Sequence, residues 1–191
     1  MAFTLPLPAP RSPSDGEGVA RWYAHELGWA TARGNAGGPV ELLTGLRFDV
    51  LELPAAAGFA VLGRLGGRGP VALAGSRMRL LVAAGSADEL PGLLDWLDWG
   101  GIALDLVALG AGDRMAAPVP PGWSGSGSPD AVSWLRPPEP GREVEPTLAA
   151  VSAVAGGAGA PCLVRLVDAA ASECHRVRLL GAYRTQRLAS S

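Results

Sequence analysis

The chain has 191 residues, 16 Arg and no Lys against 18 acidic residues, and a formal net charge of −2. This length suits one compact domain whose core needs no disulfide framework. Residues 1–160 carry 11 Arg and 16 acids, net −5, whereas residues 161–191 carry 5 Arg and 2 acids, net +3. The body of the protein therefore lacks the basic surface that phosphate neutralisation demands of a nucleic-acid binder.

In the first 14 residues Pro6, Pro8 and Pro10 interrupt the apolar run and there is no basic leader, so we expect a flexible arm rather than a signal peptide. Asp15 is a suitable N-cap for a helix that continues to about Leu27, with Gly28 as the stop. His25 is expected on the surface of this helix or partly buried. Extended segments follow at 40–44 and 46–54, then a short helix at 55–67, and then a hairpin or two consecutive strands at 70–75 and 78–85.

Residues 86–101 predict a helix with Ser86 as N-cap and Glu89 as its capping-box partner. Leu90, Leu93, Leu94 and Leu97 form its apolar stripe. Trp96 and Trp99 are three residues apart on this helix. We expect them to pack against the sheet or a second subunit rather than to stack on nucleic-acid bases.

Residues 102–109 predict a strand that the turn 110–113 joins to a second strand at 114–119 as a hairpin. A loop at 120–130, an extended run at 131–138, a small-residue helix at 146–154 and an amphipathic helix at 162–184 complete the chain, and residues 189–191 are expected to be disordered. This order of elements is typical of an α+β domain, which we place at residues 15–155, with an Arg-bearing C-terminal helix or tail at 156–191.

Two cysteines, Cys162 and Cys174, are too few for a disulfide framework and lack metal-ligand spacing, so we interpret them as small, semi-buried residues. Their use suits a reducing compartment. The longest uncharged stretch, residues 146–164, is Gly-rich and interrupted by Pro161, so we predict no membrane span. The expected localisation is cytoplasmic.

Three segments, "FDVLELPAAAG", "GPVALAGSRMRLLV" and "ALDLVALGAGDRMAAPVPPG", together with the entry helix "GVARWYAHELGWA", resemble the primase/polymerase N-terminal domain of the archaeo-eukaryotic primase superfamily. The resemblance covers roughly residues 16–150 and is strongest to short copies in high-GC bacteria. It implies a split α+β core with a mixed, mostly antiparallel sheet related to the RNA-recognition type. Active members of that family synthesise strands by two-metal nucleotidyl transfer, and they use a D-x-D pair, a Ser-x-His and a lone Asp.

The acid pair of this family should lie in "VLELP", where Glu52 matches the first acid and Pro54 replaces the second. Asp49 is the remaining candidate. Strand side chains alternate between faces, so we expect Asp49 and Glu52 to point to opposite sides of the sheet unless a bulge rotates one of them. Asp105 matches the lone metal-binding Asp, so Asp105 and Glu52 are the candidate metal ligands and could hold at most one ion.

The Ser-x-His motif should lie in "AGSRMRLLV". Ser76 is present, but Met78 replaces the histidine, or Arg79 does if the register shifts by one. Arg77 and Arg79 could contact a triphosphate together with Ser76; the alternative is that they are solvated charges on an edge strand.

The leading hypothesis is a primase/polymerase-like protein that has lost nucleotidyl transfer and acts as a non-catalytic binding or regulatory module, with a protein partner or as a homodimer, and without a cofactor. One alternative is a nucleotide-handling enzyme with a rebuilt single-metal site that uses Mg²⁺ or Mn²⁺. Another is nucleic-acid binding through the C-terminal tail.

Overall fold

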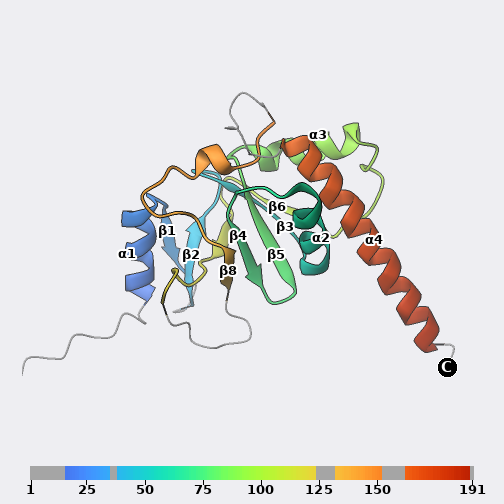
Figure 1. Ribbon diagram of the computed structural model, residues 1–191, viewed down its shortest axis with the longest axis horizontal. Coiled ribbons are helices and arrows are strands. Elements are labelled where there is room, and N and C mark those ends of the chain that lie inside the picture. The colour runs from blue at the N-terminus through green and yellow to red at the C-terminus, as the bar shows by residue number, and fades with distance from the viewer. Residues whose placement is uncertain (1–15, 35–37, 124–131, 152–161, 190–191) are drawn as a thin grey trace, which may run out of the picture.

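The computed structural model describes residues 16–34, 38–123, 132–151 and 162–189. The expected arm at 1–14 and most of the loop at 120–130 lie outside these ranges. Four helices and two mostly antiparallel sheets make up the described part, which confirms the α+β class. Figure 1 shows α1 at one end of the molecule and α4 at the other.

The larger sheet has five strands in the order β6-β3-β5-β4-β8. All of its neighbouring strands pair antiparallel. The strands β4 and β5 form a hairpin, one of the two arrangements expected for them, with β5 in the centre of the sheet. Their bounds are β3 Asp49–Pro54, β4 Val71–Ala74, β5 Arg77–Val82, β6 Val107–Leu109 and β8 Ser133–Arg136.

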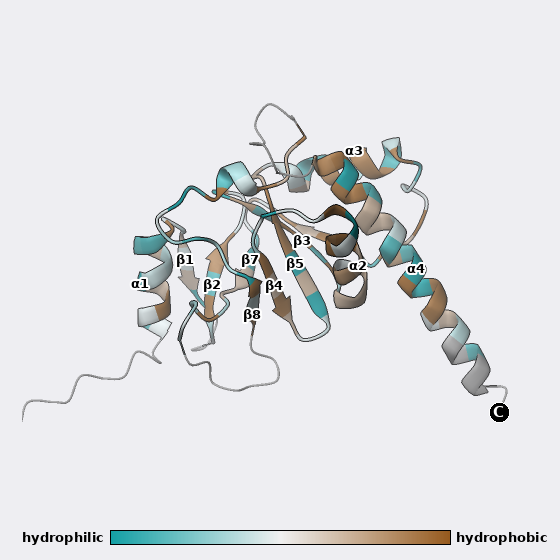
Figure 2. Ribbon diagram, viewed as in Figure 1, coloured by the Kyte–Doolittle hydropathy of each residue, from teal (hydrophilic) through white to brown (hydrophobic). Residues whose placement is uncertain are grey.

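One face of this sheet is covered by three helices, α2 (Ala55–Leu65), α3 (Ser86–Trp96) and α4 (Leu163–Ala189). Leu51, Met78 and Val82 point to this face, because alternate strand residues share a side. The first half of α4 contributes Leu163 and Val167 to the same core, so the segment expected as a C-terminal helix packs on the sheet over that half. Figure 2 shows the apolar interior strands and the mixed polarity along α4.

The opposite face is covered at one end by α1 (Gly16–Glu26) and by a second sheet of three strands in the order β1-β2-β7. Val50 and Leu81 of the large sheet meet Tyr23, Trp29 and other buried residues there. The Tyr23 hydroxyl donates to the carbonyl of Pro118 at 2.8 Å and accepts from the indole of Trp134 at 3.0 Å. The bounds of the small sheet are β1 Thr31–Arg33, β2 Val40–Leu43 and β7 Arg114–Ala116.

The predicted hairpin at 102–119 is wrong. The strand β6 pairs with β3 in the large sheet, whereas β7 pairs with β2 in the small one. The turn at 110–113 therefore carries the chain from one sheet to the other. Contacts with residues distant in the sequence hold this turn in place. One of them is the hydrogen bond that the Thr44 hydroxyl donates to the Gly110 carbonyl at 2.6 Å.

Two expected helix features also differ. The N-cap of α3 is Gly85 with φ of 89°, and Ser86 is a buried residue inside the helix, so the capping box does not form. In place of a helix at 146–154, the described residues contain a short 3-10 turn, Glu145–Thr147, followed by extended backbone at Leu148. The carbonyl of Ala149 accepts from the backbone N–H of Ala83, so this segment is held against the large sheet instead.

The C-terminal end of α4 extends beyond the body of the protein (Figure 1), and Leu179, Leu180 and Tyr183 are exposed on it. Ala189, expected to be disordered, is the last residue of this helix, and residues 190–191 lie outside the described ranges. No helix in the described part of the chain combines the length and the apolar character that a membrane span requires.

Candidate functional site

Four of the candidate residues, Glu52, Arg77, Arg79 and Asp105, contact one another at the face of the large sheet that carries Val50. Glu52 of β3 lies directly opposite Arg79 of β5, and Arg77 lies opposite Pro54. Alternation places Glu52, Arg77 and Arg79 on the face that carries Val50. We call Glu52, Arg77, Arg79 and Asp105 the acid–arginine cluster.

Both carboxylate oxygens of Glu52 are bound by arginine. The Nε of Arg79 donates to Oε2 at 2.7 Å, and the Nε of Arg77 donates to Oε1 at 3.1 Å. The Nη1 of Arg77 donates to Oδ1 of Asp105 at 2.6 Å. Arg77 therefore lies between the two carboxylates that the sequence proposes as metal ligands.

The cluster balances two carboxylates against two guanidinium groups. Burial by itself raises the pKa of Glu52, but the hydrogen bonds and charges of Arg79 and Arg77 outweigh it and lower this pKa below its usual value. For Arg77, burial opposes the charged form, yet hydrogen bonds to Asp105 and Glu52 raise its pKa. Both side chains stay charged at neutral pH. The Nη1 of Arg79 is buried without a hydrogen-bond partner among the described residues.

Asp49 lies on the opposite face, as strand alternation predicts, and it is not part of the cluster. Its Oδ2 accepts from the backbone N–H of Ala87 at 2.8 Å, so the carboxylate binds the N-terminal turn of α3. Burial raises the pKa of Asp49, and the hydrogen bond from Ala87 opposes that shift. Asp49 as a whole is 1% exposed, and its Oδ1 has no hydrogen-bond partner in the described part of the chain.

Asp105 does not lie inside a strand, because β6 begins only at Val107. The backbone before β6 is instead bonded to α4: the Sγ of Cys174 donates to the Asp105 carbonyl at 3.6 Å, and Arg178 donates to the Ala103 carbonyl. The Asp105 side chain is 58% exposed. It reaches the cluster from the edge of the sheet.

Ser76 and Met78 do not join the cluster. Ser76 lies in the exposed turn between β4 and β5, where its carbonyl accepts from the N–H of Ala55. Met78 is fully buried on the helix-covered face. Of the two positions considered for the histidine, only Arg79 shares the face of Glu52.

The interpretation of Arg77 and Arg79 as edge-strand charges is wrong, because β5 is the central strand of five. Their side chains are only 24% and 16% exposed. They are structural partners of Glu52 rather than solvated charges.

No cluster of three or more His, Cys, Asp or Glu side chains suited to a metal ion occurs within the described ranges. His25 is exposed on α1, as expected. Both cysteines are free: Cys162 is half-buried and Cys174 is buried. Burial, together with the nearby charge of Asp105, raises the pKa of Cys174 to about 11.

The two tryptophans of residues 86–101 do not share a helix face, because α3 ends at Trp96 and the chain turns at Asp98 with φ of 62°. Trp96 is 72% exposed. The indole of Trp99 donates to Asp168 of α4 at 3.3 Å and lies beside the ring of His175. Trp99 thus packs against a helix, and Trp96 is left on the surface.

A second place of interest is a cavity beside the β4–β8 edge, which the sequence did not indicate. Its arginines, Arg68, Arg136 and Arg142, are 74 residues apart in sequence from first to last, and no motif connects them. Only the pairing of β4 with β8 brings them together.

Comparison of the chain with protein-family models, with curated proteins and with solved structures gave no match.

Proposed function

We propose that this chain is a non-catalytic binding or regulatory module of primase/polymerase-like ancestry that acts in the cytoplasm. One observation carries the proposal: the Arg77 guanidinium lies within hydrogen-bond distance of both Glu52 and Asp105. Two-metal transfer needs carboxylates that bridge ions about 4 Å apart. Carboxylates that are already neutralised by arginine, with Asp49 on the other face, are poorly suited to that chemistry.

The exposed apolar residues at the end of α4 support a protein partner or a second copy of this chain as the bound molecule. Leu179 and Tyr183 are four residues apart, and Leu180 and Tyr183 three apart, so the three side chains form one stripe. Exposed apolar stripes of this kind commonly mark protein–protein contacts.

The catalytic part of the proposal is tested by template-dependent incorporation of labelled ribo- and deoxynucleotides with Mg²⁺ or Mn²⁺, on primed and unprimed templates. We expect no product. Incorporation that disappears in Asp105→Ala and persists in a matched surface variant, Asp113→Ala, would contradict the proposal and favour the nucleotide-handling alternative.

Titration calorimetry separates binding from catalysis. Wild type should give no heat with Mn²⁺. Arg77→Ala should gain weak Mn²⁺ binding, because it removes the cation from Asp105 and from Oε1 of Glu52, while Arg79 keeps Oε2. Millimolar or tighter Mn²⁺ affinity in wild type would show that arginine does not block these carboxylates.

Partner binding is tested by light scattering of the full chain and of the double variant Leu180→Gln/Tyr183→Gln. Self-association that the double variant abolishes identifies a homodimer through α4. Nucleic-acid binding through residues 161–191 requires an affinity that falls steeply with salt and is lost when these residues are deleted.

A further inference from the structure

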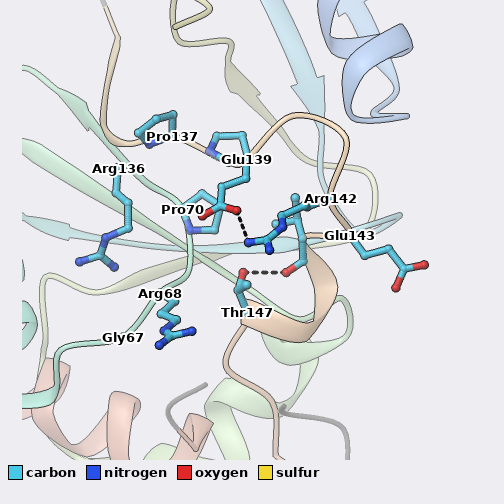
Figure 3. Close-up of a pocket in the computed structure, with 11 residues that line it drawn as sticks. Gly67, Arg68, Pro70, Arg136, Pro137, Glu139, Arg142, Glu143 and Thr147 are labelled. Carbon is cyan, nitrogen blue, oxygen red and sulfur yellow. Dashed lines mark hydrogen bonds and ion pairs between the residues drawn. The ribbon is translucent and has the colours of Figure 1, made fainter. Parts of the chain in front are cut away.

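The cavity beside β4 and β8 has a volume of about 630 Å³. Its walls are the segment that precedes β4, from Gly67 to Pro70, and the last residue of β8, Arg136, with the chain that follows it to Thr147. This volume lies within the range of small-molecule sites, which is about 300–1,000 Å³. Figure 3 shows the residues that line it.

The lining contains three arginines and two glutamates, but the charges do not all pair. Arg142 forms an ion pair with Glu139 at 2.6 Å. Glu143 extends away from the arginines in Figure 3. Arg68 and Arg136 line the cavity and have no carboxylate partner among the described residues, so no acid in that part of the chain neutralises these two guanidinium charges.

Arg136 is held in place rather than free in solvent. Its side chain is half-buried, and its Nη1 donates to the carbonyl of Gly69 at 3.1 Å. The backbone of Gly69 is close to β5 and to the chain after β8. A Cβ on Gly69 would lie 3.5 Å from the carbonyl oxygen of Leu81 in β5 and 3.2 Å from that of Thr147. A fixed guanidinium loses little further freedom when it binds an anion.

Three prolines supply a rigid apolar wall. All three line the cavity; Pro137 is exposed, and Pro70 and Pro138 are buried. Proline fixes its own φ, so this wall needs little ordering on binding. An apolar wall with a few fixed polar groups is the usual composition of a small-molecule site.

We propose that this cavity binds a small organic oxyanion, a phosphate or a carboxylate, through the guanidinium groups of Arg68 and Arg136, with the organic part against the prolines. Arginine matches both oxyanions because its planar fork donates two parallel hydrogen bonds. A long polyanion fits less well, since residues 1–160 carry a net charge of −5. The inference goes beyond the proposed function and shares no residue with the acid–arginine cluster, so either can fail without the other.

The test uses the full chain and three probes: phenyl phosphate, benzoate and the uncharged phenol. Amide chemical shifts are followed by NMR up to millimolar probe. We expect the two anions to shift the amides of Gly67, Gly69 and Thr147, and phenol to leave them unchanged. Binding of only phenyl phosphate identifies a phosphate site, and binding of only benzoate identifies a carboxylate site.

Variants connect the signal to the arginines. Arg68→Gln should weaken anion binding about tenfold, the value of one charge-assisted contact, without a change in folding, because Arg68 is exposed and unpaired within the described ranges. Arg136→Gln should weaken anion binding by a similar factor, and because it also removes the hydrogen bond to the Gly69 carbonyl, its urea midpoint is measured together with its affinity. Arg165→Gln, which replaces an exposed arginine on α4, should have no effect. Shifts elsewhere in the chain, equal response to phenol, no binding of any probe, or equal loss in Arg165→Gln would each overturn the inference.

Discussion

Glu52 should stabilise the fold far more than Asp105, although both carboxylates bind Arg77. The side chain of Glu52 is 19% exposed and both of its oxygens are bound, whereas that of Asp105 is 58% exposed and holds one contact. Glu52→Gln removes the charge and leaves Arg79 beside a neutral amide. Arg79 is 16% exposed, and its Nη1 already has no hydrogen-bond partner among the described residues.

Breaking a fully buried pair by removing one partner costs about 3–5 kcal/mol, and one charge-assisted hydrogen bond contributes about 1.5–3 kcal/mol. Because the cluster keeps some contact with water, we expect Glu52→Gln to lower the free energy of unfolding by about 2 kcal/mol. Asp105→Asn resembles the loss of a surface pair and should cost about 0.5 kcal/mol.

Urea unfolding at pH 7, followed by circular dichroism, measures both values, and equal m-values confirm that the two states compared are the same. The reasoning is refuted if Asp105→Asn costs as much as Glu52→Gln, or if Glu52→Gln costs less than about 0.5 kcal/mol.

Three further predictions concern the same fold. The pKa of Glu52 is lowered in the folded protein, so the stability that its ionised form contributes is present above the usual pKa of 4.5 and is lost as pH falls through the folded pKa. In urea unfolding, the difference in unfolding free energy between wild type and Glu52→Gln should therefore shrink as pH falls below 4.5. Gly58→Ala should cost about 1–3 kcal/mol in the same assay, because its Cβ would lie 2.3 Å from Sδ and 2.9 Å from Cβ of buried Met78. Gly63→Ala on the same helix meets nothing within 4 Å and should stabilise by about 0.5–1 kcal/mol, so the opposite ranking would show that Gly58 is not a packing site. Tyr23→Phe should lower the unfolding free energy by about 1–3 kcal/mol, because it leaves a buried carbonyl and an indole N–H without their hydroxyl partner; an unchanged thermal midpoint would contradict this.

Local pattern was sufficient for the elements whose signals are local. Apolar periodicity, with Gly and Pro at the ends of the elements, predicts the helices α1, α2 and α3, the strands β4 and β5, and the C-terminal helix. The opposite orientation of Asp49 and Glu52 follows from strand alternation alone and is confirmed. The α+β class needs nothing more than this order of elements.

The features that sequence reasoning missed depend on partners distant in the chain. The strand pairing of residues 102–119 failed because β6 and β7 join different sheets. The place of Arg77 between two carboxylates depends on the approach of Asp105 from the sheet edge, 28 residues away. A periodicity can specify which face of a strand a side chain occupies, but not which strand lies beside it.

The sequence by itself determined the types of most elements, the separation of Asp49 from Glu52 and the uneven charge of the chain. Only the tertiary structure decided that arginine neutralises the candidate metal ligands, and that Arg68 and Arg136 meet at one cavity. The physical reason is range: helix and strand periods act over a few residues, whereas ion pairs and cavities are made by segments that only sheet pairing and core packing bring together.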